Sequence, residues 1–284
     1  MIRVFVDSGS SIKQDEKEKY GVEILPLKLN MGGREYADGI DLSIEQFYQK
    51  LIVDGIFPKT SLPSLGDAET RVKAYTDAGD DVIILTISSG ISGTYNALRT
   101  IFSDNKKVKV IDTRTAVGGI RLLVDEINKY RDQSVDFIER KIMKLIPRIR
   151  VVAVPETLEY LCKGGRLSLT AMVAGTILKI KPLISLDSYS GKVKVIGKAI
   201  GLKRAMMAVA ESLRQLDCDE NYGIIPSYTF CKENLDILLS VTNDKYKPQM
   251  QEYDNLDPAI ACHWGPNAFG YIFVSKATMQ HIEQ

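Results

Sequence analysis

The run DVIILTI, residues 81–87, constrains the fold more than any other stretch of the chain. Its apolar residues are consecutive from Val82 to Leu85. Successive side chains of a strand point to opposite faces of a sheet, so a strand with this run is apolar on both faces. Strands of that kind are typical of a parallel sheet with helices on both sides. The run therefore predicts an α/β fold.

Similar short runs, rich in β-branched residues, recur along the first half and predict further strands at residues 3–7, 23–29, 108–112 and 150–155. Segments with a helical period lie between them, at residues 42–52, 93–102 and 134–146. We therefore expect an N-terminal α/β domain over residues 1–155, built as an α/β/α layer with a mainly parallel sheet.

The pattern changes beyond residue 155, which predicts a second α/β domain with a mixed sheet over residues 156–284. A hairpin is expected where SYSG separates the runs 182–187 and 192–197. Helical patterns follow at residues 169–178, 202–216 and 230–241, and strand patterns at residues 222–228, 249–254, 258–263 and 269–275. No flexible linker separates the two parts, so we expect them to pack closely.

The overall composition excludes several classes of function. The 284 residues carry 37 Lys and Arg against 36 Asp and Glu, so no global charge draws the chain to nucleic acid or to an acidic membrane. The four cysteines form no C-x-x-C pair and only two histidines are present, so we expect no metal site. No apolar run approaches the roughly 20 residues of a membrane span, so we expect a cytoplasmic protein without stable membrane insertion.

Polar residues cluster where the predicted strands end, at Asp7–Ser11, at Ser88–Thr94, at Asp112–Arg114 and at His263. Ligands of α/β sheets collect outside the carboxyl ends of the strands. These loops are therefore the candidates for a binding site.

The loop ISSGISGTYNA, residues 87–97, has the composition of an anion site. Gly90 and Gly93 allow a sharp turn and a close approach to a ligand, and Ser92 precedes the N–H groups of a helix N-terminus. It matches neither a Walker loop nor G-x-G-x-x-G, so it does not indicate a nucleotide. The alternative is a serine that only caps its helix. In KTSLPS, residues 59–64, Thr60 and Ser61 offer hydroxyl groups ahead of the next helix.

A nucleophilic serine is a second hypothesis for the same loop. Ser92 or Ser89 would need a base, and His263 is the candidate because His281 falls in the C-terminal tail. The chain lacks the G-x-S-x-G elbow, and no acidic residue is close to His263 in the sequence. The alternatives for His263 are a ligand contact and a purely structural histidine.

The stretch KGGRLS, residues 163–168, predicts a stiff turn between two helices. Gly164 or Gly165 is expected to end one helix in the left-handed region, and Ser168 to cap the next. Arg166 on this turn suits bidentate recognition of a carboxylate or phosphate, or is a plain surface arginine. Residues 169–178 carry no charge, so this helix is either core or the lining of an apolar cavity.

Taken in order, these motifs resemble one known family. They are DS at Asp7, T-S-x-P-S at Thr60, I-S-S-x-x-S-G-T-Y at Ile87, V-P-x-T-L-E-Y-L-x-K-G-G-R-L-S at Val154, and H-x-G-P at His263. The chain resembles the DegV family, which includes the fatty acid-binding B subunits of bacterial fatty acid kinase. The resemblance runs from Asp7 to Gly270.

The resemblance implies a two-domain DegV-like fold with a ligand tunnel near the junction, occupied by a long-chain fatty acid. It implies a carrier and not an enzyme, without a cofactor, that presents the fatty acid carboxyl to a separate ATP-dependent kinase subunit. The acyl phosphate then feeds phospholipid synthesis. The carboxylate-binding residues implied by the motifs are Thr60, Ser61, Ser92, Gly93 and His263. Arg166 is implied to lie near the head group or to face the kinase.

The candidates for the tunnel lining are Met172, Ile177, Leu178 and Trp264. Trp264, the only tryptophan of the chain, stands within His-Trp-Gly-Pro-Asn where the family commonly has His-Thr-Gly-Pro-Gly. Leu62 and Leu65 also differ from the glutamine and proline that are common in the family. Trp264 is therefore expected either to narrow the pocket or to change how the head group is bound.

Overall fold

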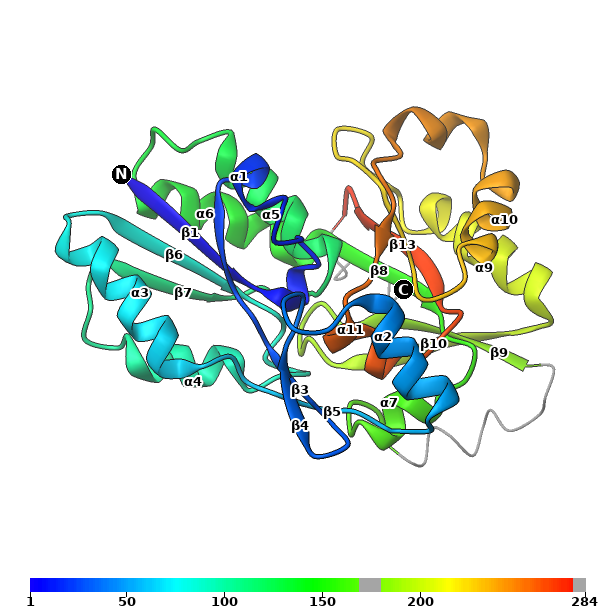
Figure 1. Ribbon diagram of the computed structural model, residues 1–284. Coiled ribbons are helices and arrows are strands. Elements are labelled where there is room, and N and C mark those ends of the chain that lie inside the picture. Colours follow the sequence, from blue (N-terminus) through cyan, green and yellow to red (C-terminus); the bar gives the residue numbers. More distant parts are fainter. Residues whose placement is uncertain (169–179, 278–284) are drawn as a thin grey trace. The chain divides into compact units, whose positions relative to one another are not determined.

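The computed structural model describes residues 1–168 and 180–277 (Figure 1). The chain divides into two compact units. The first unit contains Met1–Ile146 and Asp257–Ala259, and the second contains Pro147–Leu256 and the chain from Ile260. Each unit has its own main sheet. Within the described ranges no helix is long and apolar enough to cross a membrane.

The main sheet of the first unit has the strand order β2-β1-β6-β7, and every neighbouring pair is parallel. The strands are β1 (Ile2–Asp7), β2 (Val22–Leu25), β6 (Asp81–Thr86) and β7 (Val108–Asp112). In β6, every residue after Asp81 is buried. The parallel sheet predicted from DVIILTI is therefore confirmed.

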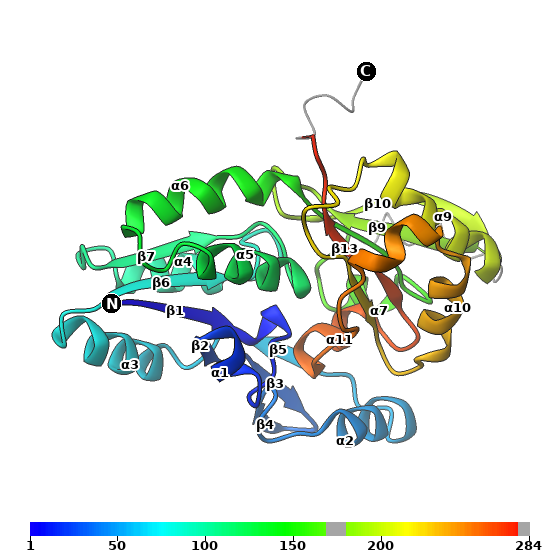
Figure 2. The ribbon, with the colours of Figure 1, turned by 90° about the horizontal axis from the view of Figure 1, so that it is seen from above.

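Helices cover both faces of this sheet. Helices α3 (Leu65–Asp77) and α4 (Thr94–Ile101) pack against Phe5, Val82 and Ile84 on one face. Helices α5 (Gly118–Asn128) and α6 (Val135–Leu145) lie on the side of the sheet opposite to α3 (Figure 2). The result is the expected α/β/α layer.

Residues 23–29, predicted as one strand, form parts of two strands in different sheets. Pro26 and Leu27 separate β2 from β3 (Lys28–Met31), because proline lacks the N–H group that a continuous ladder needs. Strands β4 (Arg34–Ala37), β3 and β5 (Lys59–Ser61) make a small antiparallel sheet. The remaining helical segments of the first unit are η1 (Ser8–Ser10), α1 (Lys17–Tyr20), α2 (Ile44–Tyr48) and η2 (Gln49–Val53).

The sheet of the second unit is mixed, as predicted, with the order β10-β9-β8-β13-β11-β12. Among its described strands, only β11 and β12 pair in parallel. The strands are β8 (Ile149–Val154), β9 (Ile180–Leu186), β10 (Val193–Ile200), β11 (Ile225–Tyr228), β12 (Asp254–Asn255) and β13 (Phe269–Val274). Strand β8, which the sequence groups with the strands of the first half, pairs here with β13 and β9. Helices α9 (Leu202–Gln215) and α10 (Glu233–Val241) pack on the buried face of this sheet.

Residues 258–263, predicted as a strand, form part of helix α11 (Pro258–Trp264). A short apolar run does not by itself distinguish a buried strand from a buried helix. Proline at the first helical position and the alanines at 259 and 261 favour the helix. His263 therefore does not follow a strand, and this prediction is wrong. The other helical segments among the described residues are η3 (Ile146–Arg148), which begins at the last residue of the first unit, α7 (Glu159–Lys163) and η4 (Asp244–Gln249).

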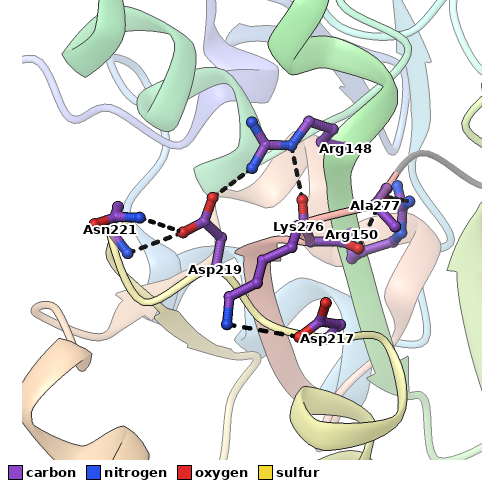
Figure 3. Close-up of polar contacts among 8 residues, drawn as sticks. Arg148, Arg150, Asp217, Asp219, Asn221, Lys276 and Ala277 are labelled. Carbon is purple, nitrogen blue, oxygen red and sulfur yellow. Dashed lines mark hydrogen bonds and ion pairs between the residues drawn. The ribbon is translucent and has the colours of Figure 1, made fainter.

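Two arginine side chains at the start of β8 bond to the chain that follows β13 (Figure 3). Arg148 pairs with the Asp219 carboxylate, and its Nε donates to the Ser275 carbonyl at 2.8 Å. Arg150, almost fully buried, donates to the Ala277 carbonyl at 3.1 Å. Burial lowers the pKa of Arg150 to about 10, and the positive charge of Arg148 adds to this effect. These bonds hold the chain after β13 against the start of β8.

Candidate functional site

The loops after β1, β6 and β7 lie side by side at one edge of the parallel sheet, as the strand order requires. Asp7 at the end of β1 accepts a hydrogen bond from the Ile87 N–H at 2.8 Å. The Ser89 hydroxyl donates to Asp112 Oδ2 at 2.5 Å, and the Ser89 N–H donates to Oδ1 at 2.9 Å. The carboxylates at the ends of β1 and β7 therefore hold the loop that follows β6.

Asp7 is fully buried, and both of its carboxylate oxygens bond to backbone. Oδ1 accepts from the Gly9 N–H at 3.0 Å, while Oδ2 accepts from Ile87. Burial raises the pKa of Asp7 to about 7, and the two N–H bonds oppose this shift. Asp7 thus sets the shape of its own loop and of the start of the serine loop.

Ser92 lies at the start of helix α4. Its Oγ accepts from the Thr94 N–H at 3.3 Å and shares a hydrogen bond of 2.9 Å with Thr94 Oγ1. Gly93 is the N-cap residue and has no side chain to cap the helix. Ser92 is half-buried, so its hydroxyl lies beside the first N–H groups of α4 without being sealed in the core. Such a hydroxyl next to a helix N-terminus favours a negatively charged or strongly accepting group.

The strand that carries Thr60 and Ser61 lies beside this loop. In β5, Thr60 pairs with Leu29 and Ser61 with Lys28. A Cβ atom placed on Gly93 would be 3.5 Å from Leu62 Cδ2, so the residue after Ser61 contacts the turn before α4. In the first unit, the end of the strand that carries Thr60 and Ser61 is therefore next to the turn that carries Ser92 and Gly93.

In the second unit, α7 ends in the turn that carries Arg166. Gly165 has φ +73°, the left-handed conformation that the sequence predicts for one of the two glycines. The Arg166 N–H donates to the Leu161 carbonyl at 2.9 Å, and the Arg166 guanidinium donates to the Gly164 carbonyl at 2.5 Å. The side chain is thus folded over its own turn. The predicted helix 169–178, with Met172, Ile177 and Leu178, lies outside the described residues.

His263, in the last turn of α11, packs against Gly164 of the same unit. Its Nδ1 atom is buried and would be 2.2 Å from a Cβ atom on Gly164. Burial lowers the pKa of His263 to about 3, and the nearby charge of Arg166 adds to this effect. The imidazole is therefore uncharged at neutral pH. Trp264, the next residue, is buried.

Two further residues, which sequence reasoning missed, hold the turn after His263. The buried Thr229 hydroxyl donates to the Gly265 carbonyl at 2.6 Å and accepts from the Ala268 N–H at 2.9 Å. Glu156 accepts from Asn267 Nδ2 at 2.7 Å. Glu156 could have been found from the sequence, because it falls within the VPET motif. Nothing in the sequence around Thr229 indicates that it contacts this turn.

With this geometry established, we compared the chain with known proteins. The model of the DegV family, described as an uncharacterised protein family, matches residues 1–276. The chain belongs to the DegV family. A DegV domain-containing protein of Clostridium acetobutylicum is 30% identical over 280 residues, which cover 97% of this chain and 99% of that protein. Another, from Caldanaerobacter subterraneus, is 30% identical over 282 residues and covers 97% and 99%.

Solved DegV structures share the fold. A fatty acid-binding DegV family protein from Streptococcus agalactiae has a TM-score of 0.86 at 25% identity, covering 98% of this chain and 99% of that one. A DegV family protein from Thermus thermophilus, described by its fatty acid binding, has a TM-score of 0.84 at 26% identity, with 96% and 99% covered. The two-domain DegV fold expected from the motifs is therefore confirmed.

The hydroxyl groups of the two candidate nucleophiles, Ser89 and Ser92, form hydrogen bonds to side chains of the same unit. The Ser89 hydroxyl donates to Asp112, and the Ser92 hydroxyl bonds to Thr94. Neither of these two hydrogen bonds joins a serine to a histidine.

The described part of the chain contains no group of three or more His, Cys, Asp or Glu side chains that could hold a metal ion. All four cysteines, at 162, 218, 231 and 262, are free thiols, and only Cys231 is more than slightly exposed. Burial raises the pKa of Cys218 to about 12, with Asp219 contributing, so this thiol stays protonated.

Proposed function

We propose that this protein binds a long-chain fatty acid and presents its carboxyl group to a separate ATP-dependent kinase subunit. The observation that carries the proposal is the hydroxyl of Ser92 at the N-terminus of α4, with Thr60 and Ser61 on the neighbouring strand. The fatty acid binding described for two similarly folded DegV proteins supports it.

The head-group chemistry is suited to a carboxylate that is held and not attacked. A buried carboxylate is costly unless hydrogen bonds satisfy it. Hydroxyl donors and the partial positive charge of a helix N-terminus provide such bonds without a covalent step. In this proposal Thr60, Ser61, Ser92 and Gly93 hold the carboxylate together with His263, which is uncharged at neutral pH and contributes a hydrogen bond and no charge.

The acyl chain supplies most of the affinity. Each buried methylene contributes about 0.8 kcal/mol, so a long chain binds tightly with few polar contacts. We assign Trp264 to the lining of the acyl tunnel. The width that Trp264 leaves would select among chain lengths and degrees of unsaturation.

The protein acts in this proposal as a carrier. Its loops match no nucleotide-binding motif, so the phosphoryl donor must be held by a partner. In this proposal Arg166, a fixed positive charge on a stiff turn, lies near the head group or faces that partner and the transferred phosphoryl group. Because the donor is ATP, we place the encounter in the cytoplasm, with the acyl phosphate passing to phospholipid synthesis.

Mass spectrometry of an organic extract of the purified protein tests the binding step. We expect a stoichiometric long-chain fatty acid, and direct titration of the stripped protein with oleate should restore it. A chain that is folded, carries no fatty acid and shows no affinity for oleate would overturn the proposal. Turnover of ester substrates that disappears in a Ser92→Ala variant would establish the hydrolase instead.

A further inference from the structure

Gly164 and Gly165 are adjacent glycines with different structural requirements. Gly164 has φ −74°, a conformation that any residue adopts, but a Cβ atom there would lie 2.2 Å from His263 Nδ1 and 2.7 Å from Cε1. Gly165 has φ +73°, yet a Cβ atom there would meet nothing within 4 Å. Gly165 is therefore required by the backbone, whereas Gly164 is required chiefly because the His263 ring occupies the space of its side chain.

A second close approach fixes the backbone just after His263. A Cβ atom on Gly265 would lie 2.4 Å from Cδ2 of the Tyr160 ring, on helix α7. The Gly265 carbonyl is also held by the Thr229 hydroxyl at 2.6 Å. The segment from Tyr160 to Gly164 thus contacts the chain at His263 and again at Gly265, on both sides of Trp264, so the position of the imidazole is determined from two directions.

We propose that Gly164 is a positioning residue for His263, and that the missing side chain at position 164 sets where the imidazole lies and keeps it enclosed beside the turn that carries Arg166. The placement follows from the contacts within the second unit alone. Its consequence for a ligand rests on the proposed function, in which His263 holds the fatty acid carboxyl group. In this arrangement the positive charge beside the imidazole comes from Arg166, since the enclosed imidazole is itself uncharged at neutral pH.

Histidine NMR of the ligand-free protein tests the placement, with His281→Gln used to assign the second imidazole. We expect the His263 resonances of the wild type not to titrate between pH 5 and pH 8. In Gly164→Ala the displaced ring should titrate near its ordinary value of about 6.5. The matched control is Gly165→Asn, because asparagine tolerates the left-handed conformation and has room there. A Gly164→Ala variant whose His263 behaves as in the wild type would overturn the proposal.

A double-mutant cycle covers the case in which Gly164→Ala is too unstable for NMR. Gly164→Ala should lower the thermal midpoint strongly in the wild-type background but much less in the His263→Ala background, where the ring is gone. The 3.0 Å approach of the new Cβ atom to the Tyr160 carbonyl is common to both backgrounds and cancels in the cycle. Equal losses in the two backgrounds would mean that His263 does not determine the requirement for glycine.

Oleate binding separates this inference from the proposed function. We expect Gly164→Ala and His263→Ala each to weaken oleate binding about tenfold, and the double variant to be no weaker than either. If the wild type does not bind oleate, the proposed function fails and the NMR and stability results still decide the placement. If Gly164→Ala shifts the His263 titration but binds oleate normally, the placement stands and the assignment of His263 to the carboxyl group is wrong.

Discussion

The carboxylate of Asp7 accepts a hydrogen bond from the backbone N–H of Ile87, a residue 80 positions further along the chain, at 2.8 Å. The bond ties the end of β1 to the end of β6. The other oxygen accepts a hydrogen bond from the Gly9 N–H at 3.0 Å. Both carboxylate oxygens are therefore already engaged by the backbone. The aspartate of the DS motif therefore shapes the candidate site and does not line it.

Replacing Asp7 by alanine should destabilise the first unit. The change leaves two buried N–H groups without their acceptor, and such hydrogen bonds to a charged group contribute about 1.5–3 kcal/mol each. We expect the free energy of unfolding, measured by urea denaturation, to fall by about 3 kcal/mol. The exposed Asp15 provides the matched control as Asp15→Ala. Equal stability of the two variants would contradict this role of Asp7.

A second buried carboxylate, Asp38, should make stability depend on pH. Its oxygens accept from the Ser8 hydroxyl at 2.7 Å and from the Ala259 N–H at 3.0 Å. Burial, and then the negative charge of Asp257, raise the pKa of Asp38 to about 7, while Ser8, Ala259 and Lys13 oppose the shift. Lys13 itself pairs with Asp257 at 2.6 Å.

The unfolded chain loses the Asp38 proton near 3.8 and the folded chain near 7. Between these values the folded state binds more protons, so its stability should fall as pH rises and level off above about pH 7. One proton contributes a slope of at most about 1.4 kcal/mol per pH unit. Asp38→Asn should remove this component, so the stability of the variant minus that of the wild type should grow from pH 4.5 to pH 7.5. Urea denaturation at several pH values measures the difference, and a constant difference would contradict the assignment.

The sequence predicts those parts of the fold that depend on local pattern. A strand apolar on both faces is a local feature, and the parallel sheet and the meeting of the loops after β1, β6 and β7 follow from it. Residues 258–263 show the limit, because an apolar run of this length suits a buried helix as well as a buried strand. The pairing of β8 with β13 joins distant segments, and no local pattern encodes it.

The two glycines at 164 and 165 show the same limit within the candidate site. The left-handed turn at Gly165 is a local property and was predictable from the end of α7. The need for glycine at 164 arises from contact with His263, so it appears only once the second unit is folded. The role of Thr229 could not be predicted for the same reason, because its hydroxyl forms two hydrogen bonds to a turn far along the chain.

Ser92→Ala should weaken fatty acid binding while leaving the fold intact. Ser92 is half-buried and its hydroxyl bonds to Thr94, so its loss removes the proposed ligand donor and one weak helix cap. We expect the Kd for oleate to rise about 5- to 30-fold, equivalent to one hydrogen bond of about 1–2 kcal/mol, and Thr60→Ala to act similarly. The exposed Ser103, changed to alanine, is the control. Unchanged affinity in both Ser92→Ala and Thr60→Ala would remove these residues from the head-group site.

Arg166→Ala should separate binding from phosphoryl transfer. If Arg166 faces the kinase, oleate affinity changes less than about threefold, while the rate of acyl phosphate formation with a fatty acid kinase falls by a factor of ten or more. Arg166→Lys keeps the charge but not the planar fork, so an intermediate rate is expected. A loss of affinity as large as that of Ser92→Ala would instead place the guanidinium on the carboxylate.

Asn267 should substitute for glycine in a left-handed backbone conformation and add a side-chain hydrogen bond that glycine cannot make. It has φ +64°, and its Nδ2 donates to Glu156 Oε2 at 2.7 Å. Asn267→Gly keeps the left-handed conformation and loses only this bond to a largely exposed carboxylate, so we expect a loss of at most about 1 kcal/mol. Asn267→Ala also forces a side chain with no polar atoms into the left-handed region, which adds about 1 kcal/mol or more. The free energies of unfolding should therefore fall in the order wild type, Gly, Ala. Equal values for the glycine and alanine variants would show that the backbone conformation does not determine which residue is accepted here.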